Sequence, residues 1–330
     1  MLSCRDFLKV RADARSFFCG TNKHLYLHIN ISGYRQWKLR KPHWVNLQNV
    51  SSNNMTTVKQ TILVLTILVY GLTACKHKQT TEIRNDFKKY YDQFIVEGSF
   101  VLYDTQADKF VFYNQDQYEQ TFSPASTFKI CNSLIGLETG VIKDKYFVIQ
   151  WDSVVRNPVW DQDHDLKTAF ANSTVWYYQE LARCVGKKRM KYWLDKTNYG
   201  NADTSGGIDQ FWLTGGLRIS PQQQIDFLKR LHDNQLPFSK RSVDIVKDIM
   251  ITKDTLDYII RAKTGWGGHG KKDVGWYVGY LETNDNVYYF TNCVQIESEK
   301  LNDINRAISF DNSRTEIVYK ILDELKLTKR

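Results

Sequence analysis

A serine and a lysine three positions apart are the residues of this chain best suited to nucleophilic chemistry. Ser126 and Lys129 follow Pro124, and the pattern predicts a helix from there to about Thr139, ending at Gly140. A spacing of three places the hydroxyl and the amine on one helix face. A serine hydroxyl is a weak nucleophile until an adjacent base takes its proton. Taken alone, the pair fits a solvated helix face better than a catalytic site.

Three further short motifs follow along the chain. Ser173-Thr174-Val175 lies in a helical, aromatic stretch, Tyr199-Gly200-Asn201 has the composition of a turn, and Lys263-Thr264-Gly265 ends a predicted strand. Each has an ordinary structural interpretation: a helix serine, a turn and a strand end. Their occurrence in this order after the serine–lysine pair is informative, because composition alone would produce it in well under about one chain in a hundred.

Together these motifs resemble the active-site motifs of the penicillin-recognising serine enzymes, which carry S-x-x-K, a second serine motif and K-T-G. Ser173-Thr174-Val175 is similar to the S-x-V element of class D β-lactamases rather than the S-D-N of class A. Phe211-Trp212-Leu213 and Gly275-Trp276-Tyr277-Val278-Gly279 also resemble class D segments. The resemblance covers about 85–325, and it departs at Thr214, where many relatives have an acidic residue. It implies hydrolysis of β-lactam small molecules.

The resemblance implies a serine acyl-enzyme formed on Ser126. Class D enzymes use a lysine carboxylated by carbon dioxide as general base, which points to Lys129 for acylation and deacylation and requires no separate cofactor. A lysine amine must be neutral to react with carbon dioxide, and removal from water lowers its pKa. Phe128, Val175 and Trp212 are expected to form that apolar pocket, with the Trp212 indole N–H donating to the carbamate.

The resemblance also implies roles for residues around the nucleophile. The backbone N–H groups of Ser126 and Trp266 are expected to form the oxyanion hole, where one donor contributes about 3 kcal/mol. Ser173 is expected to relay a proton to the leaving nitrogen, helped by Lys263.

The substrate carboxylate is expected to bind at the K-T-G motif, which ends the predicted strand. Thr264 and Gly265 contribute to this site by resemblance. Arg306 is assigned as the carboxylate-binding arginine on its spacing in the chain.

Two other classes of protein would form the same acyl-enzyme. A β-lactam sensor domain acylates without turnover, but such sensors usually carry a polar residue where Val175 stands. A peptidoglycan transpeptidase or carboxypeptidase deacylates poorly and does not need apolar surroundings for Lys129. A zinc-dependent β-lactamase is not expected, because the histidines are scattered without paired metal-ligand spacing.

The positive charge of the chain is concentrated outside the region of these motifs. The formal net charge is +9, yet residues 1–54 contain nine Lys and Arg against two Asp, and Lys59 adds one more. Residues 76–330 carry 35 basic and 34 acidic residues. This nearly neutral body lacks the basic patch that nucleic-acid binding requires, so no nucleic-acid partner is expected.

An export signal is expected before the catalytic domain. From Met55 a short polar start leads into an apolar run from Ile62 to Leu72, which is too short for a membrane-spanning helix of about 20 residues. The run ends in Leu72-Thr73-Ala74-Cys75, which resembles a bacterial lipoprotein signal and implies lipidation of Cys75. A signal cleaved elsewhere and a buried core helix are the alternatives. The expected protein is exported, periplasmic or anchored to a membrane through the lipid.

These segments divide the chain into three parts: 1–54 as a non-native upstream leader, 55–75 as a lipoprotein-type signal peptide, and 76–330 as the catalytic domain. Within the last part the pattern predicts the following elements in order: a helix over 82–94, a hairpin over 100–113, mostly helices over 160–255, strands over 258–263, 274–281 and 287–294, and a final helix over 314–325. Strands at both ends around a helical insertion predict an α+β fold, with an antiparallel sheet built from both chain ends.

We predict that translation begins at Met55 and that the mature chain begins at a lipidated Cys75, because a signal peptide must stand at the N-terminus to be recognised. Intact mass and N-terminal sequencing of the expressed protein measure this directly. Peptides derived from residues 1–54 would contradict it.

Overall fold

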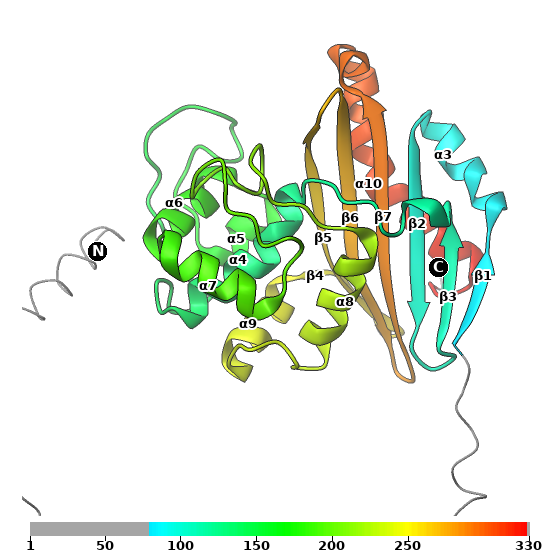
Figure 1. The fold of residues 1–330 in the computed structure, drawn as a ribbon, viewed down its shortest axis with the longest axis horizontal. Helices are drawn as coiled ribbons and strands as arrows, with labels where there is room; N and C mark the ends of the chain where they lie inside the picture. The colour runs from blue at the N-terminus through cyan, green and yellow to red at the C-terminus, as the bar shows by residue number, and fades with distance from the viewer. Residues whose placement is uncertain (1–78, 329–330) are drawn as a thin grey trace, which may run out of the picture. The chain divides into compact units, whose positions relative to one another are not determined.

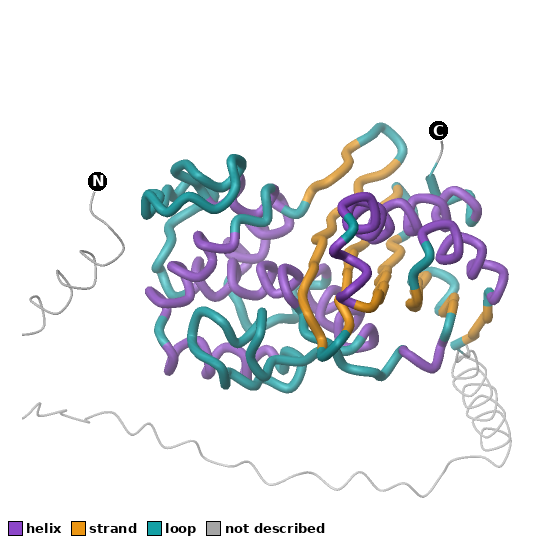
Figure 2. The backbone as a smooth tube through the Cα atoms, turned by 90° about the horizontal axis from the view of Figure 1, so that it is seen from above, coloured by secondary structure: helices purple, strands orange, loops and turns teal. Residues whose placement is uncertain are grey.

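The computed structural model describes residues 79–328, so the predicted leader 1–54, the signal 55–75 and Cys75 lie outside the described residues. The described chain forms one sheet with helices on both faces (Figures 1 and 2). Within this range no helix is long and apolar enough to cross a membrane.

The strands are β1 (Thr80–Ile83), β2 (Glu97–Asp104), β3 (Lys109–Tyr113), β4 (Ile251–Asp254), β5 (Tyr258–His269), β6 (Lys272–Thr283) and β7 (Val287–Glu297). The α-helices are α3 (Lys88–Phe94), α4 (Lys129–Glu138), α5 (Leu166–Ala171), α6 (Val175–Val185), α7 (Lys187–Thr197), α8 (Pro221–His232), α9 (Lys240–Ile249) and α10 (Ile304–Glu324). Short 3₁₀ turns are η1 (Asn85–Phe87), η2 (Gln115–Gln117), η3 (Ala125–Phe128) and η4 (Ser298–Asn302).

The sheet has the strand order β1-β3-β2-β7-β6-β5-β4, which places β2 from the N-terminal part beside β7 from the C-terminal part. The predicted α+β fold with a sheet from both chain ends is therefore confirmed. One pairing differs, because β1 runs parallel to β3. The predicted helix over 82–94 thus begins late: η1 and α3 reverse the chain into β2, and the β2–β3 hairpin reverses it again, so β3 runs in the direction of β1.

Both faces of the sheet are covered, and the side chains of β6 show how. Trp276, Val278 and Tyr280 lie in the core on the side of the helical insertion, whereas Tyr277 and Leu281 lie in the core under α10 and α3. Side chains alternate between faces along a strand, so a strand buried on both faces has a continuous apolar sequence. This explains why consecutive residues of β6 are apolar, since alternate side chains enter the two cores.

Helix α4 lies at the centre of the helical insertion and packs against α6 and α9 (Figure 1). Every residue from Lys129 to Leu137 is buried. A helix buried on all sides must be apolar around its whole circumference, and the few polar side chains on it need internal partners. The chain leaves this helix at Gly140, as predicted, where a positive φ of 67° favours glycine.

A buried polar chain ties β7 to α3 and α10. The Tyr91 hydroxyl donates to Asn292 Oδ1 at 2.7 Å, and Asn292 Nδ2 donates to the Arg314 backbone carbonyl at 2.9 Å. Asn292 is fully buried at the middle of the sheet. The amide therefore sets where α10 lies on the sheet at the level of Arg314.

We predict that Asn292→Ala lowers the free energy of unfolding by about 2–3 kcal/mol, because it leaves the buried Tyr91 hydroxyl without its acceptor and removes the amide bond that joins β7 to α10. Tyr91→Phe removes only the hydroxyl and is expected to cost about 1 kcal/mol. Urea denaturation measures both, and the slope should stay unchanged. Equal stability of Asn292→Ala and the parent would show that α10 does not depend on this contact.

Candidate active site

Ser126 and Lys129 meet as the spacing predicts. Lys129 Nζ donates to Ser126 Oγ at 2.7 Å. Ser126 lies in the 3₁₀ turn η3 rather than in an α-helix, and Lys129 is the first residue of α4. Residues three apart are eclipsed in a 3₁₀ turn, which brings the two side chains directly together.

The Lys129 amine is fully buried. Burial lowers its pKa well below the ordinary value, and the nearby charge of Lys263 lowers it further. The Tyr178 ring lies 5.2 Å from Nζ. A neutral amine beside the serine hydroxyl can accept a proton or react with carbon dioxide.

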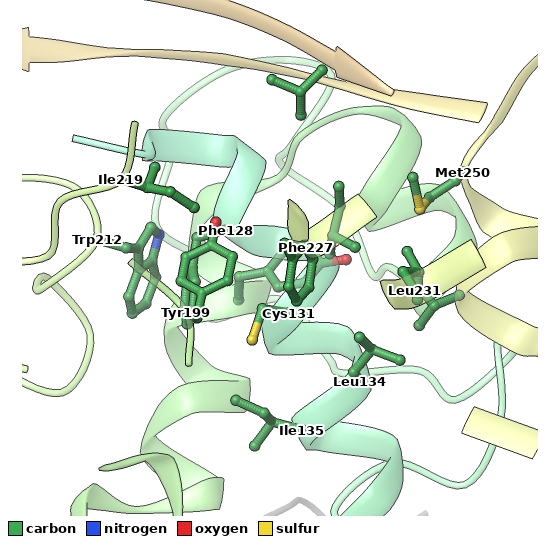
Figure 3. Packing of buried hydrophobic residues seen from close by; sticks show 14 of the residues in the cluster. Phe128, Cys131, Leu134, Ile135, Tyr199, Trp212, Ile219, Phe227, Leu231 and Met250 are labelled. Atoms are coloured by element: carbon green, nitrogen blue, oxygen red, sulfur yellow. The ribbon is translucent and has the colours of Figure 1, made fainter. Parts of the chain in front are cut away.

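An indole N–H without an acceptor lies in the core that surrounds this pair. The rings of Trp212 and Phe128 lie 5.4 Å apart, and both are fully buried (Figure 3). Trp212 Nε1 has no hydrogen-bond partner within residues 79–328. A buried donor left unpaired costs about 1–3 kcal/mol, so this site fits an added acceptor such as a carbamate oxygen. Val175, the third predicted pocket residue, is the first residue of α6 and half-buried.

Ser173 and Lys263 form a second pair: Ser173 lies between α5 and α6 of the helical insertion, and Lys263 lies on β5 of the sheet. Lys263 Nζ donates to Ser173 Oγ at 3.0 Å, and it also contacts Thr264 O at 3.1 Å and Thr264 Oγ1 at 3.3 Å. Burial lowers the pKa of Lys263 to about 7, and the charge of Arg314 adds to this effect. At neutral pH this lysine therefore exchanges a proton readily with its neighbours.

Strand β5 lies directly against the nucleophile turn η3. A Cβ at Gly265 would come within 3.0 Å of the Thr127 side chain, so glycine permits the close approach. The pairing of β5 with β4 ends at Arg261, which leaves the outer edge of β5 facing η3 from there on. Trp266 lies on this stretch. The arrangement suits two converging N–H donors, and the oxyanion hole of Ser126 and Trp266 stays a prediction.

Trp276 of β6 holds the segment that leads into the nucleophile, a contact that the sequence did not indicate. Its indole N–H donates to Ser123 O at 2.9 Å, and Ser123 Oγ donates to Trp212 O at 3.1 Å. The sheet, the nucleophile segment and the Trp212 segment are thereby joined.

The Tyr199-Gly200-Asn201 motif packs against Phe128, one of the residues predicted to form the apolar pocket of Lys129. The Tyr199 ring packs edge-on against Phe128 at 5.5 Å. Gly200 has a φ of +53°, and a Cβ there would meet Arg218 O at 2.0 Å, so only glycine fits. Asn201 Nδ2 donates to Gly216 O at 3.0 Å. The motif is therefore a packed turn in this structure.

The carboxylate-binding arginine requires a correction. Arg306 lies in the first turn of α10, where Nη1 donates to Phe94 O at 3.2 Å, away from the K-T-G strand. Arg314 lies there instead: its Nη1 donates to Gly265 O at 3.2 Å, and its guanidinium lies 5.6 Å from the centre of the Trp266 ring.

The wrong assignment of Arg306 came from a wrong prediction of where the final helix begins. The sequence predicts the final helix from 314, but Asp303 caps its N-terminus by accepting from Asn305 N and Arg306 N. Eight helical residues span about 12 Å, so the two arginines cannot share one site. Arg314 follows Phe310 by four residues and precedes Ile317 and Val318 by three and four. This helical spacing indicated that Arg314 lies on the buried apolar face of a helix that begins before 314.

Comparison with known proteins agrees with this geometry. The family model described as penicillin binding protein transpeptidase domain matches residues 85–322. Beta-lactamase OXA-48 of Klebsiella pneumoniae is 47% identical over 195 residues, covering 59% of this chain and 74% of that protein. The structure of the class D β-lactamase YbXI from Nostoc superposes with a TM-score of 0.68 at 42% identity, covering 73% of this chain and 98% of that one.

A receptor domain is also similar. The C-terminal domain of the Bacillus licheniformis BlaR penicillin-receptor gives a TM-score of 0.69 at 32% identity, covering 76% of this chain and 99% of that one. The chain belongs to the penicillin-binding-protein transpeptidase-domain family and, within it, to the class D β-lactamases. It is a β-lactamase enzyme.

We predict that Arg314→Ala raises KM for a penicillin by about 10- to 100-fold, because a charge-assisted hydrogen bond to a carboxylate contributes about 1.5–3 kcal/mol. Arg306→Ala is expected to leave KM and kcat close to those of the parent. Steady-state kinetics on the two variants measures the difference. The reverse pattern would restore Arg306 as the carboxylate-binding residue.

Proposed function

We propose that this β-lactamase hydrolyses its substrates through an acyl-enzyme on Ser126, with Lys129 carboxylated by carbon dioxide and acting as general base in acylation and deacylation. The observation that carries the proposal is the fully buried Lys129 amine, 2.7 Å from Ser126 Oγ. The depressed pKa of this amine supports its reaction with carbon dioxide. The unpaired indole N–H of Trp212 supports a bound acceptor.

In acylation Ser126 Oγ loses its proton to the Lys129 side chain and attacks the lactam carbonyl. The lactam C–N bond then breaks, and the leaving nitrogen takes a proton from Ser173. Lys263, bonded to Ser173 Oγ and with a pKa of about 7, replaces that proton. Carboxylation of Lys129 would supply an anionic oxygen base, with the Trp212 indole N–H as donor. The same base would serve to activate water for deacylation.

Binding groups surround the reacting carbonyl. The backbone N–H groups of Ser126 and Trp266 would hold the developing oxyanion. Arg314, with Thr264 and Gly265 of the K-T-G motif, would bind the substrate carboxylate. The guanidinium is supported by its contact with Gly265 O and its ion pair with Asp311.

Sensing of β-lactams without turnover is the second candidate function, because the BlaR receptor domain is similar to this chain. Such a sensor would use the same Ser126 acylation but would not release the product. Val175 favours the hydrolase, since an apolar residue there suits a carboxylated lysine. A peptidoglycan transpeptidase or carboxypeptidase is a further alternative with the same acylation step.

Export and membrane anchoring also belong to this proposal. The signal-like segment 55–75 supports a lipid on Cys75 and a location in the periplasm or on a membrane. A β-lactamase placed there would meet its substrates before they reach the enzymes of wall synthesis.

We predict sustained nitrocefin turnover by the fragment from Lys76 onward, loss of turnover after treatment at low pH in the absence of bicarbonate, and recovery when bicarbonate is added. Protonation of a carbamate releases carbon dioxide, and bicarbonate reverses this. Ser126→Ala is expected to abolish turnover. Absorbance kinetics measures each condition.

Trp212→Phe is the matched variant, because it keeps the aromatic packing and removes only the N–H donor. It should require more bicarbonate for half-maximal activity than the parent. A single stoichiometric burst without turnover would overturn the hydrolase mechanism in favour of a sensor or a cell-wall enzyme. Turnover that is insensitive to bicarbonate after the acid treatment would exclude the carboxylated lysine.

A further inference from the structure

Ser173 has a backbone conformation that serine rarely adopts. Its φ is +56°, in the left-handed region. It follows helix α5 directly: Ser173 N donates to Phe170 O at 3.2 Å and Thr174 N donates to Ala169 O at 2.9 Å, the two bonds of a Schellman helix end. Glycine usually occupies this position, and another residue keeps this strained conformation only where its surroundings hold it there.

The peptide between Asn172 and Ser173 is held at both of its polar groups. Its N–H donates to Phe170 O, and its carbonyl, Asn172 O, accepts from Trp160 Nε1 at 3.0 Å. The angle φ of Ser173 is a rotation relative to this peptide plane. The peptide on the other side of Ser173 is also held, because Thr174 N donates to Ala169 O. With both peptides held, φ and the direction of Cβ are held as well, and Oγ lies 3.0 Å from Lys263 Nζ.

Trp160 is itself anchored from the other side of Ser173. The Trp176 indole N–H donates to Trp160 O at 2.8 Å, and Trp176 is buried in the first turn of α6. Trp160 N donates to Asn157 O at 2.7 Å. Trp176 lies only three residues after Ser173. The serine is therefore enclosed in a closed circuit of contacts that runs from α5 through Trp160 to α6.

We propose that Trp160 is a positioning residue for Ser173: its indole N–H holds the Asn172–Ser173 peptide so that the serine hydroxyl stays aimed at Lys263. The inference rests on the proposed function, because it takes Ser173 as the proton relay to the leaving nitrogen. The bonds of Trp160 to Asn157 and Trp176 place its ring, but they involve neither polar group of the Asn172–Ser173 peptide.

A double-mutant cycle between Trp160→Phe and Ser173→Ala tests the proposal. Trp160→Phe removes the N–H and keeps most of the ring. It is expected to slow the acylation step with nitrocefin about 10- to 100-fold, as small displacements of reacting groups do. In the Ser173→Ala background the same substitution should change acylation less than about twofold, because residues that act through one another are not additive. The pH profile of acylation should shift in the same direction in both single variants.

Trp151→Phe is the matched control. Trp151 Nε1 donates to Val154 O at 3.1 Å within the same loop and does not touch Asn172, so acylation should equal that of the parent. If Trp160→Phe does not fold, as judged by its melting temperature, Trp176→Phe replaces it in the cycle, because it frees the Trp160 carbonyl.

Two results would overturn the inference. An equal effect of Trp160→Phe with and without Ser173 would mean that the ring acts directly on the substrate. Parent-like acylation by Trp160→Phe, while Ser173→Ala is slow, would mean that the peptide is held without the indole. Normal acylation by Ser173→Ala itself would instead refute the relay role of Ser173 in the proposed function.

Discussion

The burial of the Lys129 amine is the constraint on which the site depends. A charged ammonium removed from water is strongly disfavoured unless it is paired, and within residues 79–328 no carboxylate pairs with Lys129. Burial therefore favours the neutral amine by lowering its pKa, and the serine hydroxyl at 2.7 Å is its hydrogen-bond partner. Lys263, also buried, adds to the depression of the Lys129 pKa. Two buried lysines without carboxylate partners in the described residues would destabilise an ordinary core, but in the proposed mechanism they would supply the proton acceptor and the proton donor of one reaction.

The architecture brings these lysines together from two separate layers. Lys129 begins α4 at the centre of the helical insertion, whereas Lys263 lies on β5 of the sheet. The small surface of Gly265 lets the strand approach the nucleophile turn. Helix α10 supplies Arg314 from the opposite face of the sheet. The buried Asn292 amide, which donates to the Arg314 carbonyl, fixes the position of the helix along the sheet. The site is thus a junction whose geometry depends on how the layers pack.

Two tryptophan indoles near the site use their N–H donor in the same way, and a third differs. Trp276 donates to Ser123 O in the segment before Ser126, and Trp160 donates to Asn172 O in the peptide before Ser173, the proposed proton relay. Both donors are satisfied by backbone carbonyls. The Trp212 donor has no acceptor in the described part of the chain, which sets it apart as a group for a bound or attached ligand.

The sequence by itself determined the features that depend on residues close together in the chain. The Ser126–Lys129 pair follows from a spacing of three in a helical turn, the hairpin and the long C-terminal strands follow from apolar patterning, and the S-x-V and K-T-G motifs carry a family resemblance. Tertiary structure decided which arginine faces Gly265, because Asp303 caps α10 and the helix begins ten residues earlier than expected; the helical spacing of Arg314 from buried apolar residues was only a weak signal in the sequence. Tertiary structure also decided that β1 pairs with β3 and that Trp160 reaches Asn172. Those contacts join segments through packing, and neither periodicity nor spacing along the chain records which distant segments will meet.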